Sequence, residues 1–334
     1  MAGLVKTGQE FFDNSEILNR SIAVLQSSTT WSPANKVLAD VYVVGGGGTG
    51  GQATASGTNA KTVATGGAAG SVGASRLVLE QGTVYTITVG AGGSGAGDAG
   101  SASEFSGPGI TTINAPGGNG GNSLAGDSTG VVTVAGATGG GVATGGNLFN
   151  VNGSTSGTAE CGAGAVTQIS ATTGGTVPGL FTRDESLTSG SATTSGDSDL
   201  SFCASAAPSL VAPSLNVTQT GAGTTYGTAV GTVGGTRGYL GVENFTALGP
   251  YVIYSGSGNA SASSTGNAGA ITDAYIRGSG GTVTYNLSGT RYGIRAAMGC
   301  GGGGVARTLG GVVNAALGGN GFVAIIPIKL LEGV

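Results

Sequence analysis

Glycine constrains this chain more than any other residue, because 72 of the 334 residues are glycine, roughly three times the usual share. Each glycine in regular structure costs about 0.5–1 kcal/mol relative to alanine, so a systematic gain must offset the loss. Runs such as 117–122 (Gly-Gly-Asn-Gly-Gly-Asn) and 139–141 could lie as extended, threefold, left-handed segments that hydrogen-bond laterally. They have no strict Gly-X-Y period, which excludes a collagen triple helix. We expect packed segments of this polyglycine II kind or ordered loops, and flexible linker is the open alternative.

Three apolar runs join glycine runs directly. They are residues 41–51, 84–93 and, in reverse order, 318–328. Each apolar part is short, rich in Val and Ile, and bounded by glycine, which is typical of a β-strand. We therefore expect strands that continue into a glycine-rich layer.

Further strand signals occur at 22–25, 36–44 and 75–80. Residues 75–80 and 83–89 are joined by Gln81-Gly82, which predicts a β-hairpin, with Val84, Ile87 and Val89 set against Thr86 and Thr88. No helical period is found beyond residue 20. The predicted fold class is all-β: a glycine-rich antiparallel β-sandwich, jelly-roll-like, with long glycine-rich loops and polyglycine II segments.

Charge and cysteine content exclude several classes of function. Charged residues make up 8% of the chain and the net charge is −4, which gives no basis for binding nucleic acid. The chain has no histidine, so the usual Ser-His-Asp and Cys-His catalytic groups cannot form. Cys161, Cys203 and Cys300 form no CxxC pair, which excludes a zinc site of that type and a disulfide framework. A single Cys161–Cys203 disulfide stays open beside the preferred alternative of buried thiols.

Residues 45–50 (Gly-Gly-Gly-Gly-Thr-Gly) match the GxGxxG pattern of dinucleotide-binding proteins and follow a strand. The pattern needs a helix next, but residues 52–73 have no helical period, so we expect no nucleotide or other cofactor. Asp197-Ser198-Asp199 suits a solvated turn better than Ca²⁺. Asp184 and Glu185 are the carboxylate pair on which a carbohydrate-active enzyme would depend, and we expect no catalytic residue and no metal site.

Seven of the nine tyrosines lie between residues 226 and 292, in a stretch that is locally rich in arginine. Tyrosine and arginine are favoured anchors of recognition surfaces, although tyrosine is also an ordinary strand residue. The candidate receptor-binding residues are Tyr239, Tyr251, Tyr254, Tyr275, Tyr292, Arg277, Arg291 and Arg295.

Several of these stretches together resemble a known family. Thr29-Thr30-Trp31-Ser32-Pro33, the strand into 45–48, residues 85–93 (Tyr-Thr-Ile-Thr-Val-Gly-Ala-Gly-Gly) and residues 319–323 (Gly-Asn-Gly-Phe-Val) are similar to the glycine-rich domain of bacteriophage tail fibre and virion proteins. Glycine-rich phage adhesins at fibre tips are similar in composition. The resemblance covers 31–93 and 299–328, and implies a structural or receptor-binding role in a virion, usually as an oligomer and often a trimer.

These observations predict a non-enzymatic virion protein, a tail fibre or spike component or adhesin that contacts a host surface glycan. The alternatives are a capsid decoration or head-fibre protein and an extracellular glycine-rich matrix protein. The expected divisions are an attachment arm (1–30), a glycine-rich β domain (31–148), an inserted Ser/Thr- and then Tyr-rich region (149–298) and the closing strand of the first domain (299–334). Residues 1–16 lack a secretory signal, so we expect assembly in the host cytoplasm, exposure on the particle, and partners among other virion proteins but no membrane insertion.

Overall fold

The computed structural model describes residues 23–54, 60–164, 168–172, 174–175, 177, 191–195, 216–220, 261–263, 283–285, 291–293, 298–307 and 317–331. Within these residues the regular elements are all strands, and no helix occurs. The prediction of an all-β chain is confirmed for this part of the chain, and most of its strand pairs are antiparallel, although four pairs are parallel.

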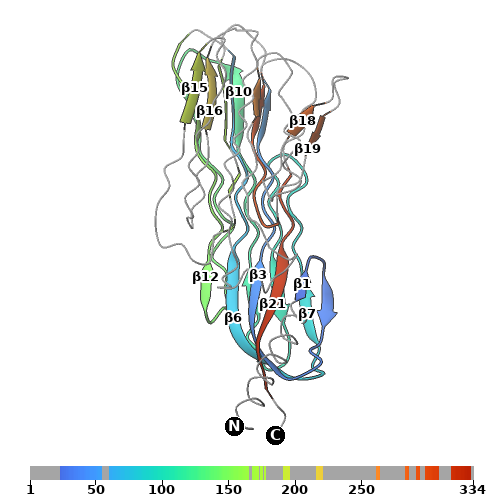
Figure 1. Cartoon of the computed structure of the whole chain (residues 1–334). Coiled ribbons are helices and arrows are strands. Elements are labelled where there is room, and N and C mark those ends of the chain that lie inside the picture. Colours follow the sequence, from blue (N-terminus) through green and yellow to red (C-terminus); the bar gives the residue numbers. More distant parts are fainter. Residues whose placement is uncertain are drawn as a thin grey trace, which may run out of the picture.

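One five-stranded sheet holds both ends of the described chain. Its order is β1 (Ala23–Leu25), β21 (Phe322–Leu330), β3 (Val37–Val44), β6 (Val72–Leu79) and β12 (Phe149–Val151), and all neighbours are antiparallel. β21 pairs with β3 from Phe322 opposite Val44 onward, with a register shift between Pro327 and Lys329. The first and last described strands are therefore neighbours at one end of the molecule (Figure 1).

A second sheet contains β2 (Thr29–Trp31), β7 (Tyr85–Thr88), β8 (Ser103–Ser106) and β9 (Ile113–Ala115), again antiparallel. Side chains from both sheets form one hydrophobic cluster that includes Val41 and Val323 from the first and Ile87 and Phe105 from the second. The rings of Tyr85 and Phe105 stack in this cluster with centroids 5.4 Å apart. Strand residues alternate between core and solvent, as the period of two requires; β7 reads buried, exposed, buried, exposed.

The predicted hairpin between residues 75–80 and 83–89 is wrong. Both stretches form strands, but β6 pairs with β3 and β12, whereas β7 pairs with β2 and β8. The turn at Gly82, whose φ is +69°, carries the chain from one sheet to the other, and the Gly82 amide donates to Pro33 O at 3.0 Å. Tyr85 lies in the core while Val84 is 56% exposed, so Val84 does not share the buried face that its alternation with Thr86 predicted.

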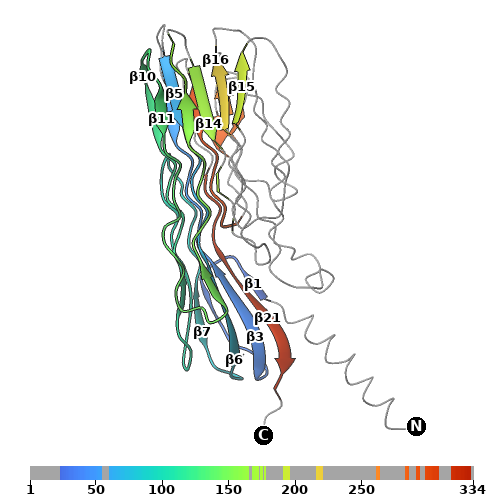
Figure 2. The same cartoon turned by 90° about the vertical axis from the view of Figure 1, so that its left-hand side faces the viewer.

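The other end of the molecule holds shorter strands (Figures 1 and 2). One sheet has the order β10 (Ser123–Asp127), β5 (Ala60–Ala64), β14 (Gln168–Thr172), β16 (Asn216–Thr220) and β15 (Ser191–Ser195). The others are β11 (Val132–Val134) with β13 (Ala159–Cys161), β17 (Ser261–Ser263) with β20 (Val305–Arg307) and β4 (Gln52–Thr54), and β18 (Val283–Tyr285) with β19 (Arg291–Gly293).

Between the two ends run glycine-rich segments that form no strand ladder, which we call the glycine layer. They are residues 45–51, 65–71, 90–93, 98–101, 116–122, 135–141, 153–157, 174–175, 177, 299–304 and 317–321. Most of them join a strand at one end of the molecule to a strand at the other: residues 45–51 connect β3 to β4, and residues 65–71 connect β5 back to β6.

Hydrogen bonds across the glycine layer repeat every three residues. Successive amides of residues 45–51 donate to different neighbouring segments, and every third amide donates to the same segment. The amides of Gly45, Gly48 and Gly51 donate to the carbonyls of Ser71, Ala68 and Thr65, respectively, at 2.8–3.0 Å. Those of Gly46 and Thr49 donate to Ser101 and Asp98, and that of Gly47 donates to Gly319. The carbonyls of the same segment accept from three more segments, through the amides of Gly118 and Gly121, Gly93 and Gly97, and Gly302. Residues 45–51 are thus bonded to six surrounding segments.

Burial follows the same period. Residues 45–51 and 65–71, at the centre of the layer, are buried throughout, whereas in residues 153–158 the exposed positions are Thr155 and Thr158. A backbone that completes one turn every three residues presents every third residue to the same side. An outer segment therefore exposes the side chain at every third position to solvent. An inner segment is surrounded by other segments and exposes none.

Close backbone contact explains the glycines of the layer. A Cβ atom added at Gly45, Gly48 or Gly50 would lie closer than 3.0 Å to a backbone carbonyl of Pro116, Asn119 or Gly303, respectively. The positive-φ residues of the described chain do not include these three glycines. Glycine is required there because another backbone occupies the space of a Cβ atom. The close approach allows the lateral hydrogen bonds of the layer, and these offset the entropic cost of glycine.

Candidate functional site at the far end of the molecule

The end opposite β1 and β21 is the candidate functional site, and we call it the far end. In its described part it comprises β4, β5, β10, β11 and β13 to β20, with the turns 128–131 and 162–164. Segments of the glycine layer lead directly into these strands: residues 45–51 precede β4 and residues 116–122 precede β10. Because each segment is bonded laterally to its neighbours, the layer fixes where the far-end strands begin.

The described surface of the far end is apolar and acidic. Leu124 and Val131 are 52% and 56% exposed, and Asp127 and Glu160 are exposed carboxylates. Thr133 Oγ1 donates to Glu160 Oε2 at 3.0 Å across the β11–β13 pair.

Buried ionisable groups lie beneath this surface. Cys161 is fully buried on β13, its Sγ lies 3.8 Å from Thr62 O, and burial raises the pKa of its thiol to about 11. Burial also lowers the pKa of Lys61 on β5. A thiol that stays protonated at neutral pH is a poor nucleophile, so Cys161 acts as a core residue beside Val63 and Val134.

Cys300 is also buried and packs with Tyr42, Val44 and Phe322. Cys203, the other member of the Cys161–Cys203 disulfide left open by the sequence, lies outside the described residues. In the structure Cys161 is a buried free thiol and not part of a disulfide.

Most candidate receptor-binding residues also lie outside the described residues: Tyr239, Tyr251, Tyr254, Tyr275, Arg277 and Arg295. Arg291 and Tyr292 lie on β19, which pairs with β18 so that Tyr285 is opposite Arg291 and Thr284 is opposite Tyr292. The described part of the expected attachment arm (1–30) contains β1 and the start of β2. The expected inserted region (149–298) begins with β12, which lies at the edge of the first sheet. The carboxylates Asp184, Glu185, Asp197 and Asp199 are not described either.

The GxGxxG match at residues 45–50 has a structural explanation. A dinucleotide fingerprint holds phosphate on free amides at the start of a helix, but here the amides of Gly45 to Thr49 donate to backbone carbonyls of neighbouring segments. The next element is β4. These glycines are therefore packing positions of the layer, and their amides are not available to a phosphate.

The asparagines of residues 117–122 also contribute to the lateral bonding. Residues 117–122 repeat Gly-Gly-Asn with a period of three, and both asparagines are exposed. Asn122 Nδ2 donates to Ala135 O at 3.1 Å, and Asn119 Nδ2 donates to Thr138 Oγ1 at 3.2 Å. The side-chain amides thus bond to the outer segment 135–141 at every third residue, which extends the lateral bonding beyond the glycines.

No protein-family model matches the chain, and no curated protein sequence is significantly similar to it. Within the residues that the structure describes, no three metal-ligating side chains gather into a group. The part of the chain that the structure describes contains no helix long and apolar enough to cross a membrane.

Proposed function

We propose that this chain is a non-enzymatic bacteriophage virion protein, a tail fibre or spike component that contacts the host surface through its far end. The carrying observation is the glycine layer, which separates the end formed by β1 and β21 from the strands and turns of the far end. A layer of this kind needs little hydrophobic core, because its backbone groups are bonded to neighbouring segments. It therefore supports a narrow, elongated molecule that holds loops away from its base.

The proposed architecture is a β-sandwich at the base, a polyglycine II layer in the middle and receptor-binding loops at the far end. The shared cluster of the two base sheets supports the sandwich. The three-residue period of bonding and burial supports polyglycine II, since this helix has three residues per turn and no internal hydrogen bonds. The motifs at 29–33, 85–93 and 319–323, which resemble virion proteins, belong to the base and the adjoining layer.

The proposed attachment segment is the N-terminal arm, residues 1–30, which includes β1. β1 lies at the base and pairs with β21, so a segment before it starts from the end that is remote from the far-end loops. Attachment there would direct these loops outward. A capsid decoration protein needs the same arrangement without a receptor, and the location on the particle separates the two functions.

Gold-labelled antibody against the full chain, applied to purified particles, tests this function. The proposal predicts label at fibre or spike tips. Label distributed over the capsid lattice would support the decoration protein instead, and particles without label would contradict a virion role.

Adsorption of particles to host cells tests the receptor-contacting part. Purified chain at about 1 μM should compete with the particles, and the variant with Tyr251, Tyr254 and Tyr292 changed to alanine should not. A matched control is Val78→Ser, at a residue of β6 in the base that is 43% exposed, which should compete like the wild type. Equal competition by the tyrosine variant would remove those residues from the site.

A further inference from the structure

The far end has a strand with an unpaired edge. β10 pairs with β5 along one side, and no described strand pairs along its other side. All five residues of β10 are exposed. Native proteins usually protect such an edge with lysine, proline, a bulge or a covering loop, but β10 reads Ser-Leu-Ala-Gly-Asp and carries only one charge.

Gly126 of β10 differs from the glycines of the layer. The glycines of the layer face a backbone atom where a Cβ would be, and Gly82 and Gly109 have positive φ. At Gly126 nothing lies within 4 Å of an added Cβ, and its φ is not in the positive range. Glycine within a strand often marks a place where another backbone approaches closely, and no backbone among the described residues does so at Gly126.

The direction of the free backbone groups follows from the pairing with β5. Thr65 N–H donates to Asn122 O at 2.8 Å, and Asn122 N–H donates to Thr65 Oγ1 at 2.9 Å, so the backbone groups of Asn122 point toward the segment that contains β5. Direction alternates along a strand. Leu124 and Gly126 therefore also point toward β5, and the amides and carbonyls of Ser123, Ala125 and Asp127 point to the open side.

We propose that β10 pairs antiparallel with β10 of a second copy of this chain, centred on Ala125. In this register Ala125 faces Ala125 of the second copy, and Ser123 faces Asp127, so every outward-pointing residue meets another outward-pointing residue. Each pair then exchanges two backbone hydrogen bonds. Leu124 faces Gly126 of the second copy in a pair of the closer, non-bonded kind, and its exposed side chain covers the open space at that glycine.

Charge also favours this register. The two copies of Asp127 lie at opposite ends of the paired strands, about 13 Å apart along the strand direction, which exceeds the screening length of about 8 Å at physiological ionic strength. A register with Asp127 opposite Asp127 would place like charges in direct contact. An antiparallel pair of β10 strands joins two five-stranded sheets into one.

This inference does not depend on the proposed function. β10 runs along the long axis of the molecule (Figure 1), so an antiparallel pair places the two bases at opposite ends. The contact is twofold, and it differs from the trimer that the family resemblance implies. Copies mounted side by side on one fibre cannot form it, so it is a contact between free chains or between chains on opposed fibres.

Analytical ultracentrifugation of the full chain between about 1 and 100 μM tests the pairing. The wild type should shift from monomer to dimer as the concentration rises. Ala125→Pro should weaken the dimer at least about tenfold, because it removes an outward N–H that β5 does not use. Its denaturation midpoint should stay near that of the wild type.

Cross-linking provides the second, independent arm. Residues in a bonded antiparallel pair have Cα atoms about 5.5 Å apart, within the range of a disulfide, so Ala125→Cys should form a covalent dimer on mild oxidation. Thr133→Cys, at an exposed residue of the neighbouring β11, should not. A wild type that stays monomeric, a dimer unchanged by Ala125→Pro, or failure of Ala125→Cys to cross-link would each overturn the proposal.

Discussion

A Cβ atom on Gly48 would overlap the carbonyl oxygen of Asn119. Neither residue can move aside alone, since the Gly48 amide donates to Ala68 O and the Asn119 amide donates to Thr138 O. This relationship recurs along the glycine layer. It makes the layer sensitive to a single methyl group wherever two backbones touch.

Gly48→Ala should lower the free energy of unfolding by at least about 3 kcal/mol, since overpacking against a fixed backbone costs more than overpacking against a side chain. Gly130→Ala is the matched control, because the nearest atom to its added Cβ is Ser128 Oγ at 3.6 Å. The control should change stability by no more than about 0.5 kcal/mol. Urea denaturation followed by circular dichroism measures both, and equal effects at the two glycines would contradict close backbone packing.

Thr49 is the one residue of 45–51 with a side-chain hydroxyl, and its Oγ1 is buried without a hydrogen-bond partner. Thr49→Val keeps the shape and removes the polar atom, so stability should stay equal or rise by up to about 1 kcal/mol. Ser156→Ala is the contrast, because Ser156 Oγ accepts from Ala137 N–H at 2.8 Å in a buried position. Its removal should cost about 1–3 kcal/mol, and a larger loss at Thr49 than at Ser156 would refute this assignment.

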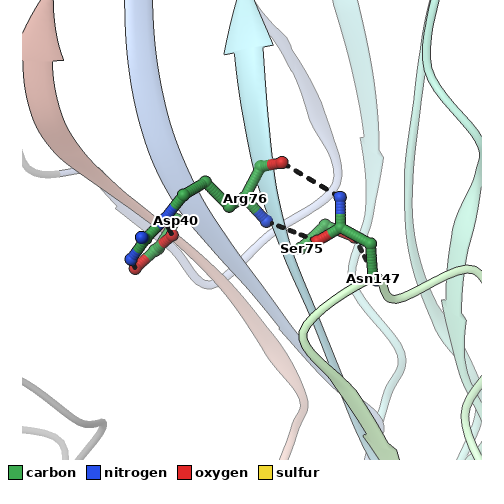
Figure 3. Close-up of polar contacts among 4 residues, drawn as sticks. All are labelled: Asp40, Ser75, Arg76 and Asn147. Carbon is green, nitrogen blue, oxygen red and sulfur yellow. Dashed lines mark hydrogen bonds and ion pairs between the residues drawn. The ribbon is translucent and has the colours of Figure 1, made fainter.

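Asn147 continues the edge of the base sheet with its side chain (Figure 3). Its Oδ1 accepts from Arg76 N–H at 2.8 Å and its Nδ2 donates to Arg76 O at 3.0 Å, beside the pair between Arg76 and Asp40. Asn147→Ala should therefore destabilise the fold by about 1–2 kcal/mol. Leu148→Ala, at the adjacent residue that is 44% exposed, should have a clearly smaller effect in the same denaturation assay.

Arg76 and Asp40 form a bidentate pair, with Nε–Oδ1 at 2.8 Å and Nη2–Oδ2 at 2.9 Å, between directly opposed residues of β3 and β6. Arg76 is largely exposed, so Asp40→Asn should cost less stability than Asn147→Ala, and its effect should shrink further as salt is added. Denaturation at low and at high salt checks this. A loss that exceeds that of Asn147→Ala at high salt would contradict the screened, exposed character of the pair.

Tyr42 predicts a pH dependence at the alkaline end. Burial, with a smaller contribution from Asp40, raises the pKa of Tyr42 from 10.0 to about 12. Because the pKa of Tyr42 is higher in the folded than in the unfolded protein, its contribution to the free energy of unfolding is fully present below pH 10. This contribution is lost as pH rises toward 12. The loss attributable to Tyr42 should reach about 2–3 kcal/mol.

Tyr42→Phe isolates that contribution, since other groups also titrate in this range. The unfolding free energy of the wild type minus that of the variant should be constant from pH 7 to about 9 and should fall by about 2 kcal/mol by pH 12. A difference independent of pH over the whole range would show that the Tyr42 hydroxyl is not buried in the folded protein.

The base strands could be predicted from the sequence because their pattern is local. Val37–Val44 and Phe322–Leu330 are apolar runs bounded by glycine, and both form strands of the first sheet. The partners of β6 and β7 could not, since Gln81-Gly82 fits a hairpin turn as well as a crossover between sheets. In the structure Tyr85 packs against Trp31 and Phe105, which lie on the two strands that pair with β7.

The unpaired edge of β10 at the far end could not be predicted from the sequence. Tyrosine and arginine content directed attention to residues 226–295, while the unpaired edge of β10 contains none of the residue types that mark a recognition surface. Its distinguishing residue is Gly126, and in a chain with 72 glycines no sequence pattern separates a glycine that faces open space from one that faces a backbone. That distinction needs the neighbours in three dimensions.

Amide hydrogen exchange of residues 45–51, measured residue by residue by NMR, tests the central claim most directly. If these residues are bonded to six neighbouring segments, the amides of Gly45 to Thr49 and of Gly51 should be protected to the same degree as those of β3, with no decrease toward the middle of the run. A flexible glycine loop between two strands would exchange at nearly the unprotected rate from Gly46 to Gly50. That result would contradict the glycine layer and the proposals that depend on it.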